Sequence, residues 1–199
     1  MRISIMDYGV GNLHSIAKGI EKTGAAVEVV SDPVDLLGSE CIVFPGVGAF
    51  GAAMDVLRPI LPGLRGKIED GTPTLGICLG MQILFDRSEE SPGPGLSVIK
   101  GSVRRLTSGR IPHMGWNDVV SGADPVFAGT PKVSQYYFAN SYVCHPSEVV
   151  GKAYTDYGER FPSVVRKGLI YGFQFHPEKS GPAGLTLLKN FVSIAEGSR

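Results

Sequence analysis

The chain has few cysteines and no cysteine pair. Its 199 residues include only Cys41, Cys78 and Cys144, with no CxxC spacing among them. An odd number of isolated cysteines argues against a disulfide framework and against a structural zinc site. We therefore expect three free thiols, each with its own role, and no bound metal.

The chain also has little charge and no long hydrophobic run. Charged residues make up 19% of the sequence, below the usual quarter, and 19 basic residues balance 19 acidic ones. This balance predicts no binding to nucleic acid or to an anionic membrane. No apolar stretch approaches the roughly 20 residues of a membrane span, and Asp7 comes too early for a signal peptide. We expect a soluble, cytoplasmic protein.

The first part of the chain alternates strand and helix patterns. The expected strands are 2–8, 26–31, 41–46 and 72–77, and the expected helices are 12–24, 49–71 (interrupted by Pro59 and Pro62) and 81–88. Such alternation predicts a parallel sheet that helices cover on both faces. Burial of both faces also explains the low charge.

After Ser88 the pattern changes to a loop rich in Pro, Gly and Ser, then to short strands and a final helix. The expected strands are 102–106, 116–121, 133–143, 151–157, 163–168 and 169–176, and the helix is 184–197. We find no internal repeat and no linker. The sequence predicts one α/β domain over residues 1–199, a three-layer sandwich with a central, mostly parallel sheet and a β-rich second half.

One thiol lies in a pattern typical of a nucleophile. The segment GICLG, Gly76–Gly80, places Cys78 between an expected strand and an expected helix. This is the cysteine form of the G-x-S-x-G nucleophile elbow, in which glycines permit close backbone approach. N–H groups of the helix that begins near Leu79 would favour the thiolate. Cys41 is expected in a buried strand, and Cys144 and His145 would point to opposite faces.

A thiolate nucleophile needs a partner that protonates the leaving group. His176 ends the strand LIYGFQFH, and Glu178 follows two residues later, within reach of the imidazole. His14 falls within the expected helix 12–24, and His113 and His145 have no acid beside them. Cys78, His176 and Glu178 form a candidate triad, in which Glu178 orients the imidazole.

The developing oxyanion also needs backbone donors. One is the N–H of Leu79, directly after the nucleophile. The segment FPGVGAF, which contains Val47 and Gly48, lies at another expected strand–loop junction. We expect it to supply the second donor.

Together, the PGVG segment, the GICLGMQ elbow and FQFHPEKS resemble the triad-type (class I) glutamine amidotransferases along the whole chain. The resemblance implies that Cys78 attacks the glutamine side-chain amide, that His176 protonates the departing ammonia, and that water cleaves the thioester. No cofactor is implied. The glutamine pocket is implied at Gln82, Ser141 and Tyr142.

Two further segments, DYGVGNLHSI and IPHMGWN, resemble those of the glutaminase subunits of imidazole glycerol phosphate synthases, which belong to this family. That resemblance implies a heterodimer with a (β/α)8 barrel subunit, which uses the ammonia to form imidazole glycerol phosphate and an aminoimidazole carboxamide ribotide. The sequence shows no GxxxxGK[ST] loop for a nucleotide, consistent with an acceptor on another chain. The candidate partner surface is Tyr8, Asn12, Met114, Trp116 and Asn117.

Val47 departs from the glycine of many relatives. Valine resists positive φ, so we expect an oxyanion site that is incomplete at rest and that the ligand of the partner completes. Other interpretations remain open. Gly9 and Gly11 with Asp32 partly match a dinucleotide fingerprint, but His14 replaces the third glycine. A cysteine peptidase, the small glutaminase of pyridoxal phosphate synthesis and a non-catalytic scaffold are further alternatives.

Overall fold

The computed structural model describes residues 1–11 and 13–198. Its strands are β1 (Arg2–Met6), β2 (Ala26–Val30), β3 (Cys41–Phe44), β4 (Thr74–Ile77), β5 (Arg87–Ser88), β6 (Gly101–Arg105), β7 (His113–Ser121), β8 (Val133–Asn140), β9 (Tyr142–Pro146), β10 (Gly151–Asp156), β11 (Arg160–Lys167) and β12 (Ile170–Phe173). Its α-helices are α1 (His14–Glu21), α2 (Phe50–Leu57), α3 (Leu61–Glu69), α4 (Leu79–Gln82) and α5 (Gly181–Gly197), with 3-10 turns η1 (Pro33–Gly38), η2 (Arg58–Ile60), η3 (Pro125–Phe127) and η4 (Pro177–Lys179).

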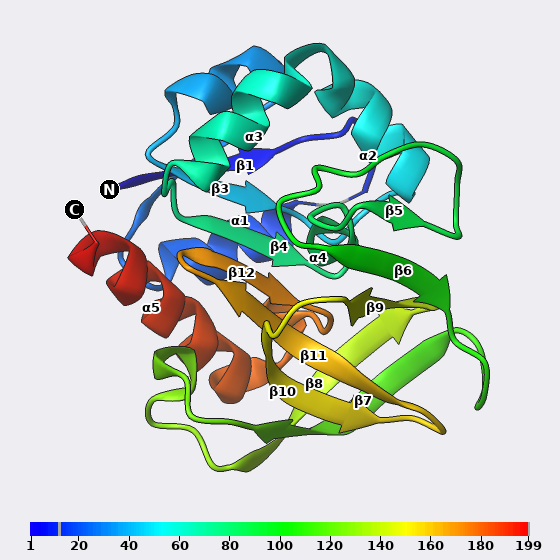
Figure 1. Ribbon diagram of the computed structural model, residues 1–199. Helices are drawn as coiled ribbons and strands as arrows, with labels where there is room; N and C mark the ends of the chain where they lie inside the picture. The colour runs from blue at the N-terminus through cyan, green and yellow to red at the C-terminus, as the bar shows by residue number, and fades with distance from the viewer. Residues whose placement is uncertain (12, 199) are drawn as a thin grey trace.

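A nine-stranded sheet in the order β2-β1-β3-β4-β12-β11-β10-β7-β8 runs through the molecule (Figure 1). Its first five strands pair in parallel, and the remaining pairings are antiparallel. The expected parallel arrangement is therefore confined to β2-β1-β3-β4-β12. In the rest of the sheet, β7 and β8, β10 and β11, and β11 and β12 are consecutive in the chain without an α-helix between them, and each pair is antiparallel. Strands β10 and β7 also pair antiparallel, although β8 and β9 lie between them in the chain.

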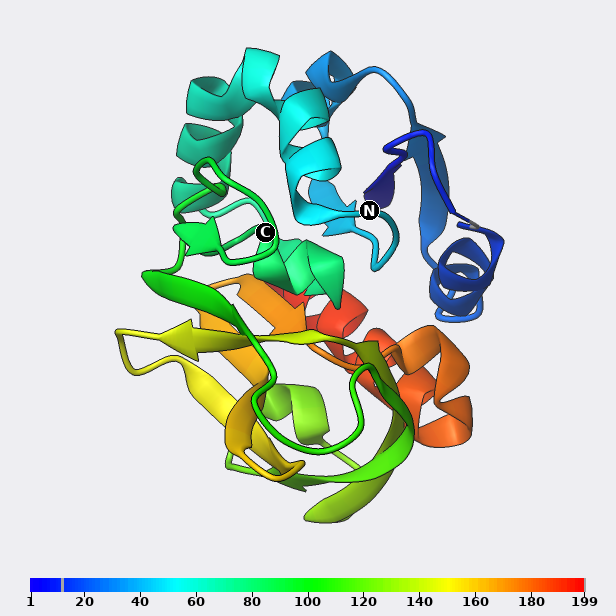
Figure 2. The ribbon, with the colours of Figure 1, turned by 90° about the vertical axis from the view of Figure 1, so that its right-hand side faces the viewer.

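Helices cover both faces of the parallel strands. Ile3 and Ile5 of β1 pack on one face with Ile16 and Ile20 of α1 and with α5. The alternate residues, such as Ile42 and Phe44 of β3, pack on the other face with α2 and α3 (Figures 1 and 2). This alternation of buried residues gives the expected three layers.

The expected interruptions at Pro59 and Pro62 are confirmed. Each proline occupies the first turn of a new segment, η2 or α3. Proline fits there because the first N–H groups of a helix have no intrahelical partner. Among the described residues, no helix is both long and apolar enough to cross a membrane.

The expected helix over 81–88 is wrong beyond Gln82, because α4 has only four residues. The carbonyls of Ile83, Leu84 and Phe85 accept hydrogen bonds from the N–H groups of Leu96, Ile99 and Ser97, respectively. The returning loop therefore takes the acceptors that a continuing helix would use.

The expected single strand over 133–143 is also wrong. The chain passes from β8 in the large sheet to β9 in a separate three-stranded sheet, β5-β6-β9. The break falls at Ser141. We call this break the seam, since it places residues of two sheets side by side.

Candidate active site

The nucleophile elbow is a tightly packed turn. Cys78 follows β4 with φ 48° and ψ −104°. This backbone conformation is strained for any residue other than glycine. A Cβ on Gly76 would meet the carbonyl oxygen of Gly80, and a Cβ on Gly80 would meet the carbonyl oxygen of Phe44. Both glycines of the predicted motif are therefore required by backbone contacts.

The sheet topology brings Cys78 and His176 together. Strands β4 and β12 are parallel neighbours with Ile77 opposite Phe173, and Cys78 N–H donates to the Phe173 carbonyl at 2.6 Å. Because the two strands are parallel, the residues that follow them, including Cys78 and His176, lie at the same edge of the sheet, where the strands have their carboxyl ends. A Cβ on Gly46 would lie 2.9 Å from Cys78 Cβ and 2.8 Å from His176 Cε1, so both side chains converge on this glycine.

His176 and Glu178 form a buried pair, with 2.8 Å between Nδ1 and Oε1. Burial alone would lower the pKa of His176, but hydrogen bonds and charge from Cys78 and Glu178 outweigh it and raise the pKa to about 9. The imidazole therefore carries its proton at neutral pH and is ready to act as an acid.

The main chain of His176 is fixed to β8 by a closed set of hydrogen bonds. His176 N–H donates to the Tyr137 carbonyl at 2.8 Å, and Tyr137 N–H donates to Ser180 Oγ at 2.9 Å. Ser180 Oγ donates in turn to the His176 carbonyl at 2.6 Å. Ser180, which the sequence did not single out, thus holds the histidine in place.

A cavity of about 210 Å³ opens beside the sulfur. It is lined by Gly46, Gly48, Cys78, Leu79, Gln82, Glu90, Ala139, Asn140, Ser141 and Tyr142. The predicted pocket residues Gln82, Ser141 and Tyr142 all contribute to it, and Gln82 Nε2 donates to the Tyr142 carbonyl at 3.1 Å. The seam therefore forms one wall of the cavity.

Sequence reasoning missed Glu90 and Asn140. Among the described lining residues Glu90 is the one acid, and its Oε2 accepts from Phe50 N–H at 2.7 Å. Asn140 Oδ1 is buried without a hydrogen-bond partner in the described structure. Glu90 lies in the loop rich in Pro, Gly and Ser, where nothing in the pattern distinguishes it from other loop acids.

The segments around Val47 and Val10 interlock. A Cβ on Gly11 would lie 2.6 Å from Val47 Cβ, and a Cβ on Gly48 would lie 2.9 Å from Val10 Cγ2. Gly48 has φ +92°. It lines the cavity with Leu79, whose N–H begins α4 and so has no intrahelical acceptor. Because α4 has only four residues, the expected helix offers the sulfur only the N–H groups of its first turn.

The predicted partner residues lie in different environments. Met114 and Trp116 on β7 are 60% and 55% exposed, whereas Tyr8 is buried. Asn117 Nδ2 donates to the Asp156 carbonyl at 3.2 Å. Asn12 lies outside the described residues.

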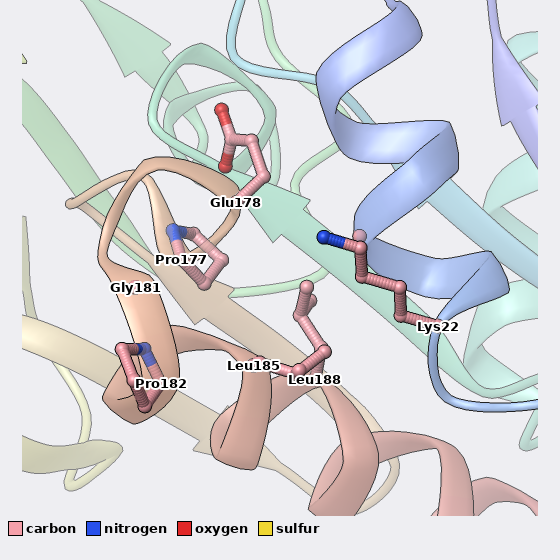
Figure 3. A pocket seen from close by; sticks show the side chains of 8 residues that line it. Lys22, Pro177, Glu178, Gly181, Pro182, Leu185 and Leu188 are labelled. Carbon is pink, nitrogen blue, oxygen red and sulfur yellow. The ribbon is translucent and has the colours of Figure 1, made fainter.

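Two other features lie apart from the sulfur. Asp32, of the partial dinucleotide pattern, accepts from Val34 N–H at 2.9 Å and caps η1. A cavity of about 330 Å³ lies between α1 and the start of α5, beyond Glu178, with Lys22 at its edge (Figure 3). It does not contain Cys78, so we assign the chemistry to the smaller cavity. The described residues hold no group of three or more potential metal ligands.

Residues 4–195 match the family described as glutamine amidotransferase class-I. The chain is 47% identical over 194 residues to imidazole glycerol phosphate synthase subunit HisH of Methanothermobacter thermautotrophicus, covering 96% of this chain and 98% of that protein. It is 43% identical over 199 residues to the subunit of that name in Bacillus cereus strain G9842, with 98% and 95% covered. The structure of PurLQS from Thermotoga maritima contains the same fold, with a TM-score of 0.72 at 22% identity over 96% of this chain and 97% of that chain.

Proposed function

The chain belongs to the class-I glutamine amidotransferase family, and we propose that it is the glutaminase subunit of an imidazole glycerol phosphate synthase in histidine biosynthesis. In this role it hydrolyses glutamine to glutamate and ammonia. The ammonia goes to a separate synthase subunit. The relatives named above, similar over nearly their whole length, support this assignment.

The observation that carries the proposal is the convergence of Cys78 and the His176–Glu178 pair at the carboxyl ends of two adjacent parallel strands, β4 and β12. The cavity beside the sulfur is large enough for an amino acid and lined by polar groups. A thiol, an acid that holds its proton and an adjacent cavity are the requirements for acyl transfer from an amide.

In the proposed reaction, Cys78 Sγ attacks the side-chain amide carbon of glutamine as a thiolate. The tetrahedral oxyanion is bound by backbone N–H groups of Leu79 and of the Val47–Gly48 segment. His176 gives its proton to the amide nitrogen, the C–N bond breaks and ammonia leaves. Water, deprotonated by His176, then attacks the thioester and releases glutamate and the thiolate.

The lining of the cavity fits the other end of glutamine. We assign Glu90 to the α-ammonium group, because it is the acid that the described lining presents. Gln82 and the seam residues Ser141 and Tyr142 line the same cavity. Gln82 contributes by fixing the Tyr142 carbonyl.

The partner in this proposal is a (β/α)8 barrel subunit that builds imidazole glycerol phosphate and an aminoimidazole carboxamide ribotide. Met114 and Trp116 provide exposed apolar surface for it on β7, which suits the aromatic anchors of protein interfaces. Asn117 belongs to the same proposed surface. Tyr8 is buried and so is not an exposed contact residue, and Asn12 lies outside the described residues.

We also propose that the partner controls the oxyanion site through Val47. Valine resists the positive φ that would let its peptide turn freely. Because Val47 packs on Gly11 and Val10 packs on Gly48, a contact with residues 7–11 reaches the peptide between Val47 and Gly48. Glutamine hydrolysis should therefore accelerate when the synthase binds its ribonucleotide ligand. Equal turnover with and without that ligand would contradict this control.

The first experiment measures glutamate release from glutamine by the chain mixed with the barrel partner and its ribonucleotide ligand. We expect activity that needs the partner and that falls by at least about 1,000-fold in Cys78→Ala. Activity that survives Cys78→Ala would move the chemistry to another residue. If the complex forms but neither the wild type nor Cys78→Ala releases glutamate, the proposed substrate is contradicted.

A further inference from the structure

Gln174 contacts the nucleophile and has no role in the mechanism described so far. Gln174 is fully buried. It is the first residue after β12, just as Cys78 is the first residue after β4, and the preceding residues Phe173 and Ile77 are paired. Gln174 Nε2 lies 3.6 Å from Cys78 Sγ, within hydrogen-bond range for sulfur. Gln174 is not among the residues that line the cavity, so it touches the sulfur from the protein side.

The orientation of the Gln174 amide follows from its neighbours. The Tyr142 carbonyl can only accept, so Gln82 must point its NH2 group toward Tyr142, at 3.1 Å. The same NH2 group lies 3.5 Å from Gln174 and therefore faces an acceptor, the Gln174 carbonyl oxygen Oε1. This leaves the NH2 group of Gln174 facing the sulfur.

In this contact the Gln174 NH2 group is the donor and the Cys78 sulfur is the acceptor. A neutral thiol is a weak acceptor, whereas a thiolate gains from each N–H that points at it. The raised pKa of His176 shows that the structure already favours a protonated imidazole beside Cys78. A buried amide held by a second amide adds a fixed dipole that does not compete with glutamine for space.

We propose that Gln174 is a hydrogen-bond donor that holds Cys78 in the thiolate form, with its amide oriented by Gln82. The proton that leaves the thiol goes to His176, and Gln174 exchanges none. This inference deepens the proposed function, on which it rests for the use of the thiolate. The state of the sulfur can nevertheless be measured without glutamine.

The test is the rate of alkylation of the full chain by iodoacetamide, followed from about pH 5 to about pH 10. Cys41 and Cys144 have no exposed surface, and Cys78→Ala serves as the blank. We expect Gln174→Met, which keeps the shape and removes the donor, to move the midpoint of the pH profile up by about one pH unit. Gln135→Met makes the same change at an exposed position of β8 and should leave the midpoint where it is.

An unchanged midpoint in folded Gln174→Met would overturn the inference. Should that variant fail to fold, Gln174→Glu decides, because it keeps the volume and replaces a donor by a group that repels a thiolate. It should also raise the midpoint, and an unchanged or lowered value would overturn the inference. Alkylation does not use glutamine, so a failed glutaminase assay with shifted midpoints would count against the proposed substrate only.

Discussion

The two halves of the large sheet differ in how closely their backbones pack and in what they expose. In the parallel half, the elbow glycines contact carbonyl groups of their neighbours, and β3 and β4 are completely buried. In the antiparallel half, β7 and β8 leave Met114, Trp116, Val120 and Val133 exposed. The reacting groups follow strands of the closely packed half, and the exposed apolar side chains of β7 and β8 belong to the other half.

The largest expected effect tests this difference in packing. Gly80→Ala would place a Cβ against the Phe44 carbonyl, so we expect a loss of at least about 3 kcal/mol in the free energy of unfolding. Gly129 lies in a turn of the antiparallel half, and a Cβ added there would meet no described atom within 4 Å. In Gly129→Ala the cost is therefore only the backbone strain of φ +76°. Its loss should be about 1 kcal/mol. Urea unfolding measures both, and equal losses would remove the distinction between the halves.

The next effect concerns the exposed half. Trp116→Ala should weaken binding to the synthase subunit by about 30-fold, as expected for an aromatic anchor. The stability of the isolated chain should fall by no more than about 1 kcal/mol, for the lost edge contact with the Tyr137 ring. Val133→Ala, which removes an exposed apolar side chain at the other end of the same strand pair, is the control and should have little effect. Titration of the labelled chain with its partner gives both affinities. Similar losses in the two variants would argue against a specific surface at Trp116.

A smaller effect concerns the link between the halves. Ser180→Ala removes the hydroxyl that joins the main chains of Tyr137 and His176, so we expect a loss of about 1–2 kcal/mol in stability. In the complex, kcat should fall more than KM changes, because the variant displaces the acid and leaves the cavity intact. Ser134→Ala, near the start of β8, the strand that contains Tyr137, is the control. A change confined to KM would contradict a positioning role for Ser180.

The smallest effect is a pH dependence. The pKa of His176 is raised above its unfolded value of 6.5 to about 9, so its stabilising contribution is complete below pH 6.5 and is lost as the pH rises through about 9. Glu178→Gln removes one of the charges that raise this pKa. We expect the NMR titration midpoint of His176 to fall by about one pH unit and the unfolding free energy to vary less over this range. A midpoint that stays near 9 would assign the raised pKa to Cys78 alone.

The sequence was sufficient to predict those parts of the fold and site that depend on local residue patterns. The alternating strand and helix patterns predicted the parallel half, and the glycine spacing around Cys78 predicted the elbow. His176 could be identified because it closes the expected strand LIYGFQFH and precedes Glu178 by two residues. These features depend on residues close together in the chain.

The features that the sequence missed depend on distant backbone contacts. The early end of α4 results from hydrogen bonds to the loop around Leu96, and the seam at Ser141 results from pairing of β9 with β6. Glu90 enters the cavity only because that loop folds back. Gln174 looked like an ordinary strand residue, because its contact with Cys78 exists only once β4 and β12 are paired.

The backbone at Cys78 carries a further consequence. With φ 48° and ψ −104°, the residue occupies a region that glycine tolerates best, so selection for folding alone would favour glycine there. Retention of a cysteine means that the chain gives up stability for a nucleophile, a trade between activity and stability at one residue. Cys78→Gly should therefore relieve backbone strain and remove the nucleophile in one step.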